Sequence, residues 1–291
     1  MRFYDGSQTH WCPGNEEIDI LLKPQPLLFG SFNIQVFGQA KYGKTVVKDK
    51  IVEILKRYDA VTVQEIRNAD ETAFPALVND MNNGTDTFGW HTGARQGSTS
   101  SKEQYGFIWN TQKLALHNAY DYEDVNGWFE RPPTVAYFNV LNENNAVQKL
   151  AVISTHIKPV TGATNQDTEV EINHLFDVYQ DAVVNEPDYV DAIIAGDMNA
   201  DCTYVKEPTD LEFYQNKNVT WLIGFDEDTT VKTTDCAYDH MVLLGPNIQS
   251  AYASPAVFDY AQFYGTDAIF YEDEAITELI SDHYPVEVTI S

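Results

Sequence analysis

The chain has 291 residues, 43% of them hydrophobic and 13% aromatic, which is ample for a packed core in one large domain. Its 44 aspartates and glutamates outnumber its 18 lysines and arginines, so the formal net charge is −26. The longest apolar runs, such as residues 192–195, are far too short to cross a bilayer, and no basic-then-apolar leader opens the chain. We therefore expect a protein without membrane association.

The excess of negative charge leaves two interpretations open. One is an acidic, soluble secreted protein. The other is adaptation to a saline habitat, where carboxylates keep the surface hydrated and salt screens their repulsion of a polyanion within about 10 Å at 0.1 M. Composition alone does not choose between them.

The elements predicted in chain order form one domain. Residues 1–26 contain Pro13, Pro24 and Pro26 without a clear period and are predicted to be an irregular arm, followed by a single domain over 27–291. Apolar periodicity predicts helices at 44–58, 71–81 and 169–184, the last with Val170, Leu175, Phe176, Tyr179 and Val183 facing inward. Strands are expected at 27–36, 60–64, 105–109, 135–141, 150–155, 192–195, 241–244 and 286–290, with a flexible loop over 91–101.

The order of these elements indicates the fold class. Several strands follow one another as hairpins, among them 135–141 and 150–155, and only a few helices interrupt them. A strictly alternating βαβ chain would not show this pattern. It favours an α+β sandwich of packed mixed sheets.

Polar ligands gather in five short segments, most of which follow an apolar run: 32–34, 63–67, 154–156, 196–201 and 281–285. An apolar strand that ends in a polar residue carries that residue to the edge of a buried sheet, where several such ends can meet. Carboxylate and amide oxygens are hard ligands suited to Mg²⁺, Mn²⁺ or Ca²⁺. The pattern predicts a divalent-metal hydrolase acting on phosphate esters.

Two of these segments have a competing structural interpretation. Glu65 ends an apolar strand, where a buried carboxylate needs either a metal or an ion pair, and Arg67 is close by. Asp197 and Asn199 stand two apart, so in extended backbone both point the same way and can share a metal. The alternative there is an Asx-turn.

Histidines and arginines supply candidates for proton transfer and phosphate binding. His156 and His283 lie beside the candidate metal ligands, and a catalytic imidazole needs an acceptor on its second nitrogen. Glu103 and Asp239 are candidate acceptors, although the residues alone do not assign the pairs. Arg67 and Arg131 are plausible phosphate contacts in a chain so poor in cations, or else ordinary surface charges.

The three cysteines are Cys12, Cys202 and Cys236. If the segments around Cys202 and Cys236 meet, a disulfide between them is feasible and indicates an oxidising compartment. Cys12 is then free, or pairs between molecules.

Longer strings in the chain resemble the deoxyribonuclease I family, within the wider endonuclease–exonuclease–phosphatase superfamily. The resemblance runs from about Leu28 to Ser291. The strings that carry it are 32–38, 102–105, 171–179, 199–205, 236–239 and 281–288, which read FNIQVFG, KEQY, EINHLFDVY, NADCTYV, CAYD and SDHYPVEV. So many matching segments are highly specific.

The resemblance implies a four-layer sandwich, two packed mixed sheets flanked by helices, with the active site at one end. It implies that Asn33, Glu65, Asp197, Asn199 and Asp282 hold Mg²⁺ or Mn²⁺ and the scissile phosphate. It also assigns the roles of the remaining candidates: His156 and His283 as the acid–base pair oriented by Glu103 and Asp239, Arg67 and Arg131 as DNA contacts, and Cys202–Cys236 as the structural disulfide.

The chain departs from the family pattern in three places. Ser101 stands where vertebrate enzymes place a DNA-stacking tyrosine, and the segment 124–129 is shorter, which puts one calcium site in doubt. At the other structural calcium site Asp228, Thr230 and Thr234 match, but Lys232 replaces a small oxygen-bearing residue. Lys232 either supplies an internal cation in place of the ion or only changes its ligation.

The resemblance implies a secreted, divalent-metal-dependent endonuclease that cleaves double-stranded DNA with low sequence specificity and leaves 5′-phosphate. We expect a salt-tolerant monomer without an obligate protein partner. The alternatives are another phosphodiesterase of the superfamily, sphingomyelinase-like or specific for abasic sites, and a catalytically silent binding relative.

Overall fold

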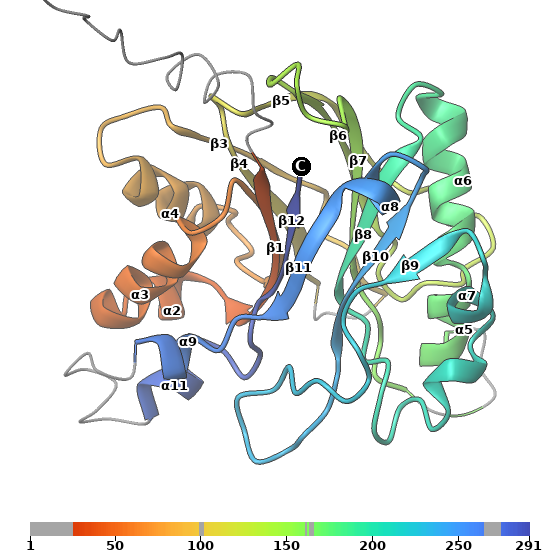
Figure 1. Cartoon of the computed structure of the whole chain (residues 1–291). Helices are drawn as coiled ribbons and strands as arrows, with labels where there is room; N and C mark the ends of the chain where they lie inside the picture. Colours follow the sequence, from red (N-terminus) through yellow and green to blue (C-terminus); the bar gives the residue numbers. More distant parts are fainter. Residues whose placement is uncertain (1–25, 99–101, 161, 163–165, 265–274) are drawn as a thin grey trace, which may run out of the picture.

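The computed structural model describes residues 26–98, 102–160, 162, 166–264 and 275–291. Two six-stranded mixed sheets pack face to face, and helices cover their outer faces (Figure 1). The predicted four-layer α+β sandwich is therefore confirmed. The expectations for Cys12, for Ser101 and for the arm, except Pro26, lie outside the described residues.

The first sheet has the strand order β11-β12-β1-β2-β4-β3. Its central strand β1 runs antiparallel to β12 and parallel to β2. The strands span Leu27–Phe37 (β1), Ala60–Ile66 (β2), Phe88–Thr92 (β3), Gln104–Asn110 (β4), Tyr252–Val257 (β11) and Val286–Ile290 (β12).

The second sheet has the order β5-β6-β7-β8-β10-β9. Its strands β7 and β8 are parallel, while β8 and β10 are antiparallel. The strands span Leu114–Asp121 (β5), Thr134–Val140 (β6), Lys149–His156 (β7), Asp191–Asp197 (β8), Val219–Trp221 (β9) and Asp239–Leu244 (β10).

The helices form the two outer layers. Those packed on the first sheet include α2 (Gln39–Tyr42), α3 (Thr45–Leu55) and α4 (Ala73–Asn82), and those on the second sheet are α5 (Thr168–Asn173), α6 (Leu175–Asn185) and α7 (Glu212–Gln215). The remaining short helices are η1 (Pro208–Asp210), α8 (Ile248–Ala251), α9 (Tyr260–Phe263) and α11 (Ala275–Ile280). In the described part of the chain, none of them is long and apolar enough to span a bilayer.

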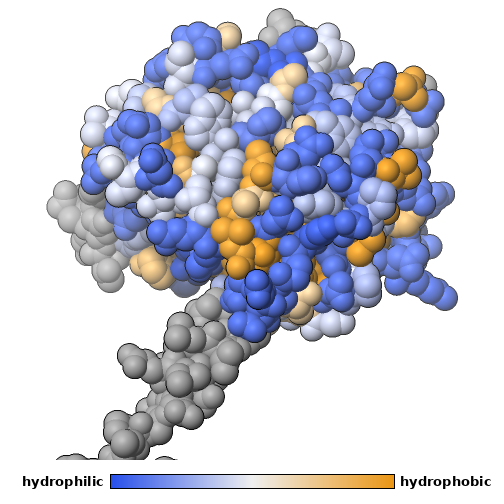
Figure 2. Space-filling model, turned by 90° about the horizontal axis from the view of Figure 1, so that it is seen from above, coloured by the Kyte–Doolittle hydropathy of each residue, from blue (hydrophilic) through white to orange (hydrophobic). Residues whose placement is uncertain are grey.

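The face of the molecule seen from above is mostly hydrophilic (Figure 2). Seen from above in Figure 2, the molecule shows charged and polar residues over most of this face, with a small hydrophobic group near its centre. This distribution agrees with a chain in which acidic residues outnumber basic ones by 44 to 18.

Every predicted core strand is present, but the sequence missed four others: β3, β5, β9 and β11. All four are edge strands, and each has many residues that are exposed or only half-buried. A strand that buries little apolar surface leaves a weak periodic signal, which is why these escaped detection. The predicted loop at 91–101 overlaps the end of β3 for the same reason.

The predicted helix at 169–184 is two helices, because His174 separates α5 from α6. The apolar residues on these helices that are fully buried are Ile172, Leu175, Val178 and Ala182. Of the predicted inward set, only Leu175 belongs to this group. The prediction assumed one continuous helix and counted the buried positions along it. The break at His174 changes that spacing, so the predicted positions in α6 do not match.

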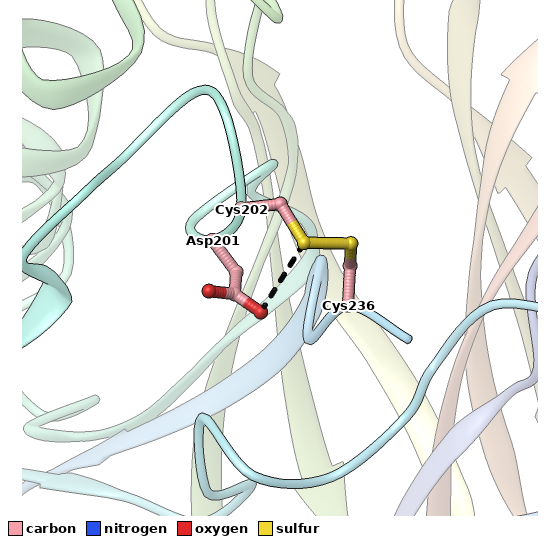
Figure 3. A group of neighbouring side chains, drawn as sticks. All are labelled: Asp201, Cys202 and Cys236. Carbon is pink, nitrogen blue, oxygen red and sulfur yellow. Dashed lines mark hydrogen bonds between the residues drawn. A yellow bond between two sulfur atoms is a disulfide. The ribbon is translucent and has the colours of Figure 1, made fainter. Parts of the chain in front are cut away.

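A disulfide joins the loop after β8 to the loop before β10. Cys202 and Cys236 are bonded, with their Cα atoms 5.9 Å apart (Figure 3). Asp201 lies beside this bond, and its carboxylate accepts a hydrogen bond from the backbone N–H of Ala237 at 2.9 Å. The predicted disulfide is confirmed, and it joins the loops that adjoin the neighbouring strands β8 and β10 of the second sheet.

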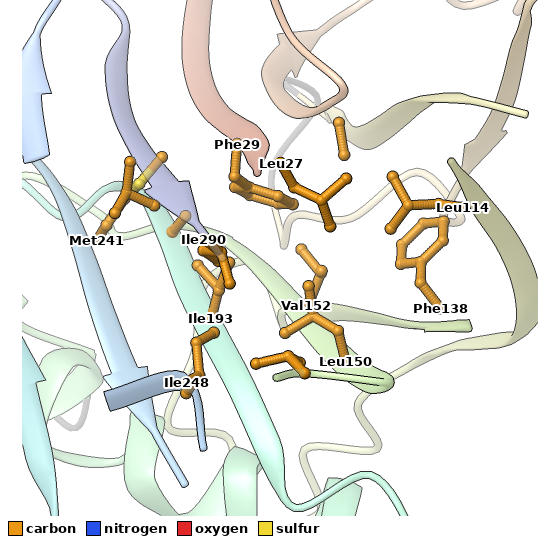
Figure 4. Close-up of a cluster of buried hydrophobic side chains, with 14 of the residues drawn as sticks. Leu27, Phe29, Leu114, Phe138, Leu150, Val152, Ile193, Met241, Ile248 and Ile290 are labelled. Carbon is orange, nitrogen blue, oxygen red and sulfur yellow. The ribbon is translucent and has the colours of Figure 1, made fainter. Parts of the chain in front are cut away.

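Between the sheets lies a core of aromatic and aliphatic side chains. Leu27 and Phe29 of β1 and Ile290 of β12 meet Val152 of β7 and Ile193 of β8 there (Figure 4). This core changes character along β1, because the same face that carries Leu27 and Phe29 next carries the buried polar residues Ser31 and Asn33.

A buried hydrogen-bond network fills the polar end of the space between the sheets. Gln64 of β2 donates to Ser31 at 3.2 Å, to Thr62 at 3.1 Å and, across to the other sheet, to Ser154 at 3.1 Å. Buried amides and hydroxyls are stable only when they are paired in this way. The sheets are thus held by apolar contacts at one end and by polar ones at the other.

Gly196→Ala should destabilise the protein strongly. Gly196 has φ +153°, and a Cβ there would lie 1.8 Å from the carbonyl oxygen of Thr155 on the neighbouring strand. We expect a loss of about 3 kcal/mol or more in the free energy of unfolding, measured by urea titration. The control is Gly84→Ala, where φ is +84° but nothing lies within 4 Å, with an expected loss of only about 1 kcal/mol. Equal losses would contradict the steric argument.

Replacing both Cys202 and Cys236 by serine should lower the free energy of unfolding by about 3–4 kcal/mol, since the bond closes a loop with a sequence separation of 34. Urea titrations with and without a reducing agent check this. The wild type should lose stability when reduced and the double variant should not respond. A wild type that is insensitive to reduction would contradict the prediction.

Candidate active site

The sheet registers place three candidate residues in one row. Parallel pairing of β7 and β8 sets His156 opposite Asp197, and antiparallel pairing of β8 and β10 sets Asp239 opposite Asp197. These residues are the last of β7, the last of β8 and the first of β10. The polar residues that follow apolar strands therefore do converge at one edge.

Irregularities in β1 and β2 direct Glu65 to this edge. The pairing of the two strands shifts register between Asn33 and Phe37, and Val36 and Glu65 have φ of +51° and +59°. Positive φ in non-glycine residues is strained and persists where surrounding contacts require it. Here the Glu65 carboxylate accepts hydrogen bonds from the backbone N–H of Val36 at 2.8 Å and from the Asn33 amide at 3.3 Å.

Asp197 is the central acceptor of the site. Its Oδ2 receives the Asn33 amide at 3.0 Å and lies 3.4 Å from Nε2 of His156 and 3.5 Å from Nε2 of His283. Burial raises the pKa of this carboxyl, and the two histidines act in the opposite direction. One buried oxygen thus brings together side chains from both sheets.

His156 is oriented by Glu103. Its Nδ1 lies 2.9 Å from Oε2 of Glu103, whose other oxygen accepts a hydrogen bond from Arg131 at 2.5 Å. Burial alone would raise the pKa of Glu103, but His156 and Arg131 outweigh it and hold that pKa at about 2. Glu103 is therefore a permanent carboxylate that fixes the ring of His156.

His283 is oriented by Asp239. The distance from Nδ1 to Oδ2 of Asp239 is 2.6 Å. Burial alone would lower the pKa of His283. The carboxylates of Asp239 and Asp197 have the larger effect and raise this pKa to about 10. The positive charge of a divalent ion bound among the same carboxylates would act to lower this pKa.

The predicted metal ligands form a set of hard oxygen donors. Asn33, Glu65 and Asp197 are linked through the Asn33 amide, as described above. Asp282 lies in the segment before β12, with Oδ2 accepting a hydrogen bond from Gln35 at 2.7 Å and Oδ1 buried without a hydrogen-bond partner, 3.8 Å from Nε2 of His283. A buried carboxylate oxygen that lacks a partner fits a site for Mg²⁺ or Mn²⁺.

Asn199 lies at the site, but not in the predicted conformation. We expected extended backbone from Asp197 to Asn199, whereas β8 ends at Asp197 and Asn199 has φ +48°. Its backbone N–H donates to Oδ1 of Asp197 at 3.1 Å, as in the alternative of an Asx-turn, and its side chain donates to the carbonyl of Ile157 at 3.0 Å. The tight turn after the strand, rather than the strand pleat, sets the direction of this amide.

The two arginines occupy different environments. Arg67 is partly exposed, and its Nη1 lies 3.8 Å from Glu65, so a loose form of the alternative ion pair is present. The side chain of Arg131 is only 12% exposed, which rules out an ordinary surface charge. Arg131 also donates to the carbonyl of His156 at 3.1 Å, and its Nη2 is buried without a partner.

Two supporting residues were missed by sequence reasoning. The hydroxyl of Tyr105 accepts the backbone N–H of His156 and donates to the carbonyl of Arg131, both at 3.0 Å. Lys41 donates to the carbonyls of Ile280 at 2.8 Å and Ile34 at 3.4 Å, and burial lowers its pKa to about 8. The one available signal was a tyrosine in a core strand, whose hydroxyl must find a partner when buried.

The candidate calcium loop lies next to the site. Oδ1 of Asp228 accepts hydrogen bonds from the backbone N–H and the hydroxyl of Thr230 at 2.9 and 2.7 Å, and this hydroxyl also contacts the carbonyl of Thr234. Lys232 points from this loop to Asp282, with 3.6 Å between Nζ and Oδ2. The shortened segment at 124–129 is closed by a hydrogen bond from the backbone N–H of Phe129 to Asp124 at 2.7 Å.

Known proteins with similar sequences cover almost the whole chain. A model of the endonuclease/exonuclease/phosphatase family matches residues 30–270. The chain is 33% identical to deoxyribonuclease-1 of Bos taurus over 91% of its length and 92% of that protein, and 32% identical to the Mus musculus protein over 94% of both.

Solved structures of low sequence identity share the fold. The catalytic domain of human Nocturnin superposes with a TM-score of 0.63 at 13% identity, covering 91% of this chain and 94% of that one. Truncated TDP2 of Caenorhabditis elegans gives a TM-score of 0.63 at 12% identity, covering 92% and 99%. Together with the geometry of the site, the sequence matches show that the chain belongs to the deoxyribonuclease I family, within the endonuclease/exonuclease/phosphatase family.

Proposed function

We propose that the protein is a secreted, divalent-metal-dependent endonuclease that cleaves double-stranded DNA with low sequence specificity and leaves 5′-phosphate ends. The observation that carries this proposal is the convergence of two carboxylate–histidine pairs on one buried oxygen. The Nε2 atoms of His156 and His283 lie 3.4 and 3.5 Å from Oδ2 of Asp197, and Glu103 and Asp239 hold the opposite ring nitrogens.

This arrangement suits hydrolysis of a phosphodiester, which needs one proton removed and another supplied. One imidazole accepts a proton from the attacking water, and the other donates a proton to the departing 3′-oxygen. The products then carry 5′-phosphate. Because Glu103 and Asp239 hold the two Nδ1 atoms, both Nε2 atoms face Oδ2 of Asp197.

Asn33, Glu65, Asp197, Asn199 and Asp282 would hold Mg²⁺ or Mn²⁺ at the site. The ion would stabilise the negative charge that builds up on the phosphate oxygens. Arg67 and Arg131 are the proposed contacts to DNA, since a guanidinium binds phosphate with two parallel hydrogen bonds. In the neighbouring loop, Asp228, Thr230 and Thr234 are proposed ligands of a structural Ca²⁺.

We also propose that the enzyme is secreted and acts as a monomer. The Cys202–Cys236 disulfide is typical of an oxidising compartment. The proposed substrate, DNA, is a polyanion, and its cleavage requires neither a membrane nor an obligate protein partner. The relatives named deoxyribonuclease-1, at 32–34% identity, favour DNA over other phosphodiesters as the substrate.

His156→Ala and His283→Ala should each lower the rate of plasmid nicking in Mg²⁺ about 10²–10⁴-fold, the contribution of a positioned imidazole to proton transfer. The wild type should lose its activity when a chelator is added. His117→Ala is the matched control, because His117 is 43% exposed and pairs with Glu186 away from the site. The folds of all variants are compared by circular dichroism.

Nicking by either site variant at the wild-type rate would remove that histidine from the mechanism. A wild type that fails to nick DNA in Mg²⁺ or Mn²⁺ would refute the proposed function. Cleavage of a sphingomyelin-type diester, or of DNA only at abasic sites, would indicate one of the other phosphodiesterase activities instead.

The enzyme should tolerate salt. A DNA-binding protein loses affinity as salt rises, with a log–log slope of about −0.9 for each phosphate contact. This chain has few cations, and its charge of −26 opposes the approach of DNA until salt screens it. Initial rates on plasmid DNA should hold or rise up to several tenths molar NaCl at fixed Mg²⁺. A steep fall that matches bovine deoxyribonuclease-1 would show that local charges at the site control the salt response.

A further inference from the structure

We propose that Lys232 binds a phosphate of the DNA backbone next to the scissile one, and so supplies part of the positive charge that the rest of the surface lacks. This inference rests on the proposed function, because the ligand is the polyanionic substrate. It concerns a residue that departs from the pattern of the family, in a loop otherwise matched to a structural calcium site.

The backbone holds Lys232 next to the catalytic segment. The N–H of Val231 donates to the carbonyl of Asp282 at 2.9 Å, and Thr230 forms an antiparallel bridge with His283. The N–H of Tyr284 donates to the carbonyl of Thr229 at 2.8 Å. These contacts fix the loop against residues 282–284, so Lys232 projects from an anchored backbone rather than from a free loop.

The charges around Lys232 favour a role in binding. Among the described residues, three lysine and arginine side chains lie within ion-pair distance of the carboxylates of the site: Arg67, Arg131 and Lys232. Their side chains are 29%, 12% and 48% exposed, so Lys232 is the most accessible of the three. The same site contains the carboxylates of Glu65, Glu103, Asp197, Asp239 and Asp282, which repel a phosphate.

A purely structural role for Lys232 explains less. Its ammonium lies 3.6 Å from Asp282, but Gln35 already holds the same oxygen of Asp282 at 2.7 Å. An ion pair in which the lysine is half exposed adds little to stability. Asp282 is thus positioned without Lys232, whereas the ammonium remains open to an anion arriving from solvent.

The test compares Lys232→Thr, which restores a small oxygen-bearing side chain, with Lys232→Arg, which keeps the charge. Lys217→Thr is the matched control: it makes the same change of charge at an exposed position after α7, on the outer helical layer. Steady-state nicking kinetics give kcat and KM. Binding of a fluorescent DNA duplex is measured by anisotropy over a salt series, in the His156→Ala background, whose slow nicking leaves the duplex intact during the measurement.

We expect Lys232→Thr to raise Kd and KM about 5-fold at low salt and to make the slope of log Kd against log salt shallower by about 0.9, the value for one phosphate contact. The variant should keep kcat within about 2-fold, because Lys232 does not move protons. Lys232→Arg should restore binding, and Lys217→Thr should match the wild type.

Two results would overturn the inference. The first is an unchanged salt slope in Lys232→Thr. The second is a fall in kcat and in thermal stability without a change in Kd, which would make Lys232 a structural partner of Asp282. A wild type that binds DNA through Lys232 but does not nick it would refute the proposed function and leave this inference standing.

Discussion

The buried carboxylate of Asp197 is the constraint on which the rest of the site depends. A charge with so little access to water is tolerated only when it is surrounded by donors or cations. Asn33 from one sheet and His156 from the other supply them, together with His283 from the segment before β12. The requirement to pair this one oxygen therefore brings both sheets and both catalytic candidates to the same point.

The side chains between the two sheets change from apolar to polar along β1, toward the site. Side chains on the inner face of β1 change from Leu27 and Phe29 to Ser31 and Asn33, and the network around Gln64 and Ser154 separates the apolar core from the charged site. A rigid polar layer of this kind positions the groups beyond it more closely than loops would. The strained backbone at Glu65 is stable because the side-chain amide of Asn33 and the N–H of Val36 fix its carboxylate.

The global and local charges of the protein act in opposite directions. A net charge of −26 weakens any long-range attraction of DNA, and salt screens both repulsion and attraction. What remains at short range is the set of cations at the site, which differ in access to solvent: Arg131 is buried against Glu103, while Lys232 is half exposed. The proposed binding of DNA therefore depends on a few positioned cations rather than on a basic surface.

The sequence by itself determined the class of the fold, the core strands and the identity of the polar residues at the strand ends, because each of these leaves a local signal, and the resemblance to the family supplied the pairing of Cys202 with Cys236. Apolar runs of strand length, a ligand placed directly after such a run, and long matching strings can all be read without coordinates. The edge strand β3 could not, since its half-exposed residues give almost no period.

Only the tertiary structure decided how the residues meet. The direction of the Asn199 side chain and the bulge at Glu65 depend on contacts with distant parts of the chain, the carbonyl of Ile157 and the N–H of Val36. Tyr105, which bonds to both His156 and Arg131, and Lys232, which reaches Asp282, belong to the site only through sheet register and loop pairing. Hydrogen bonds between residues tens to hundreds of positions apart leave no local pattern in the sequence, because the residues that flank one partner carry no information about the position of the other.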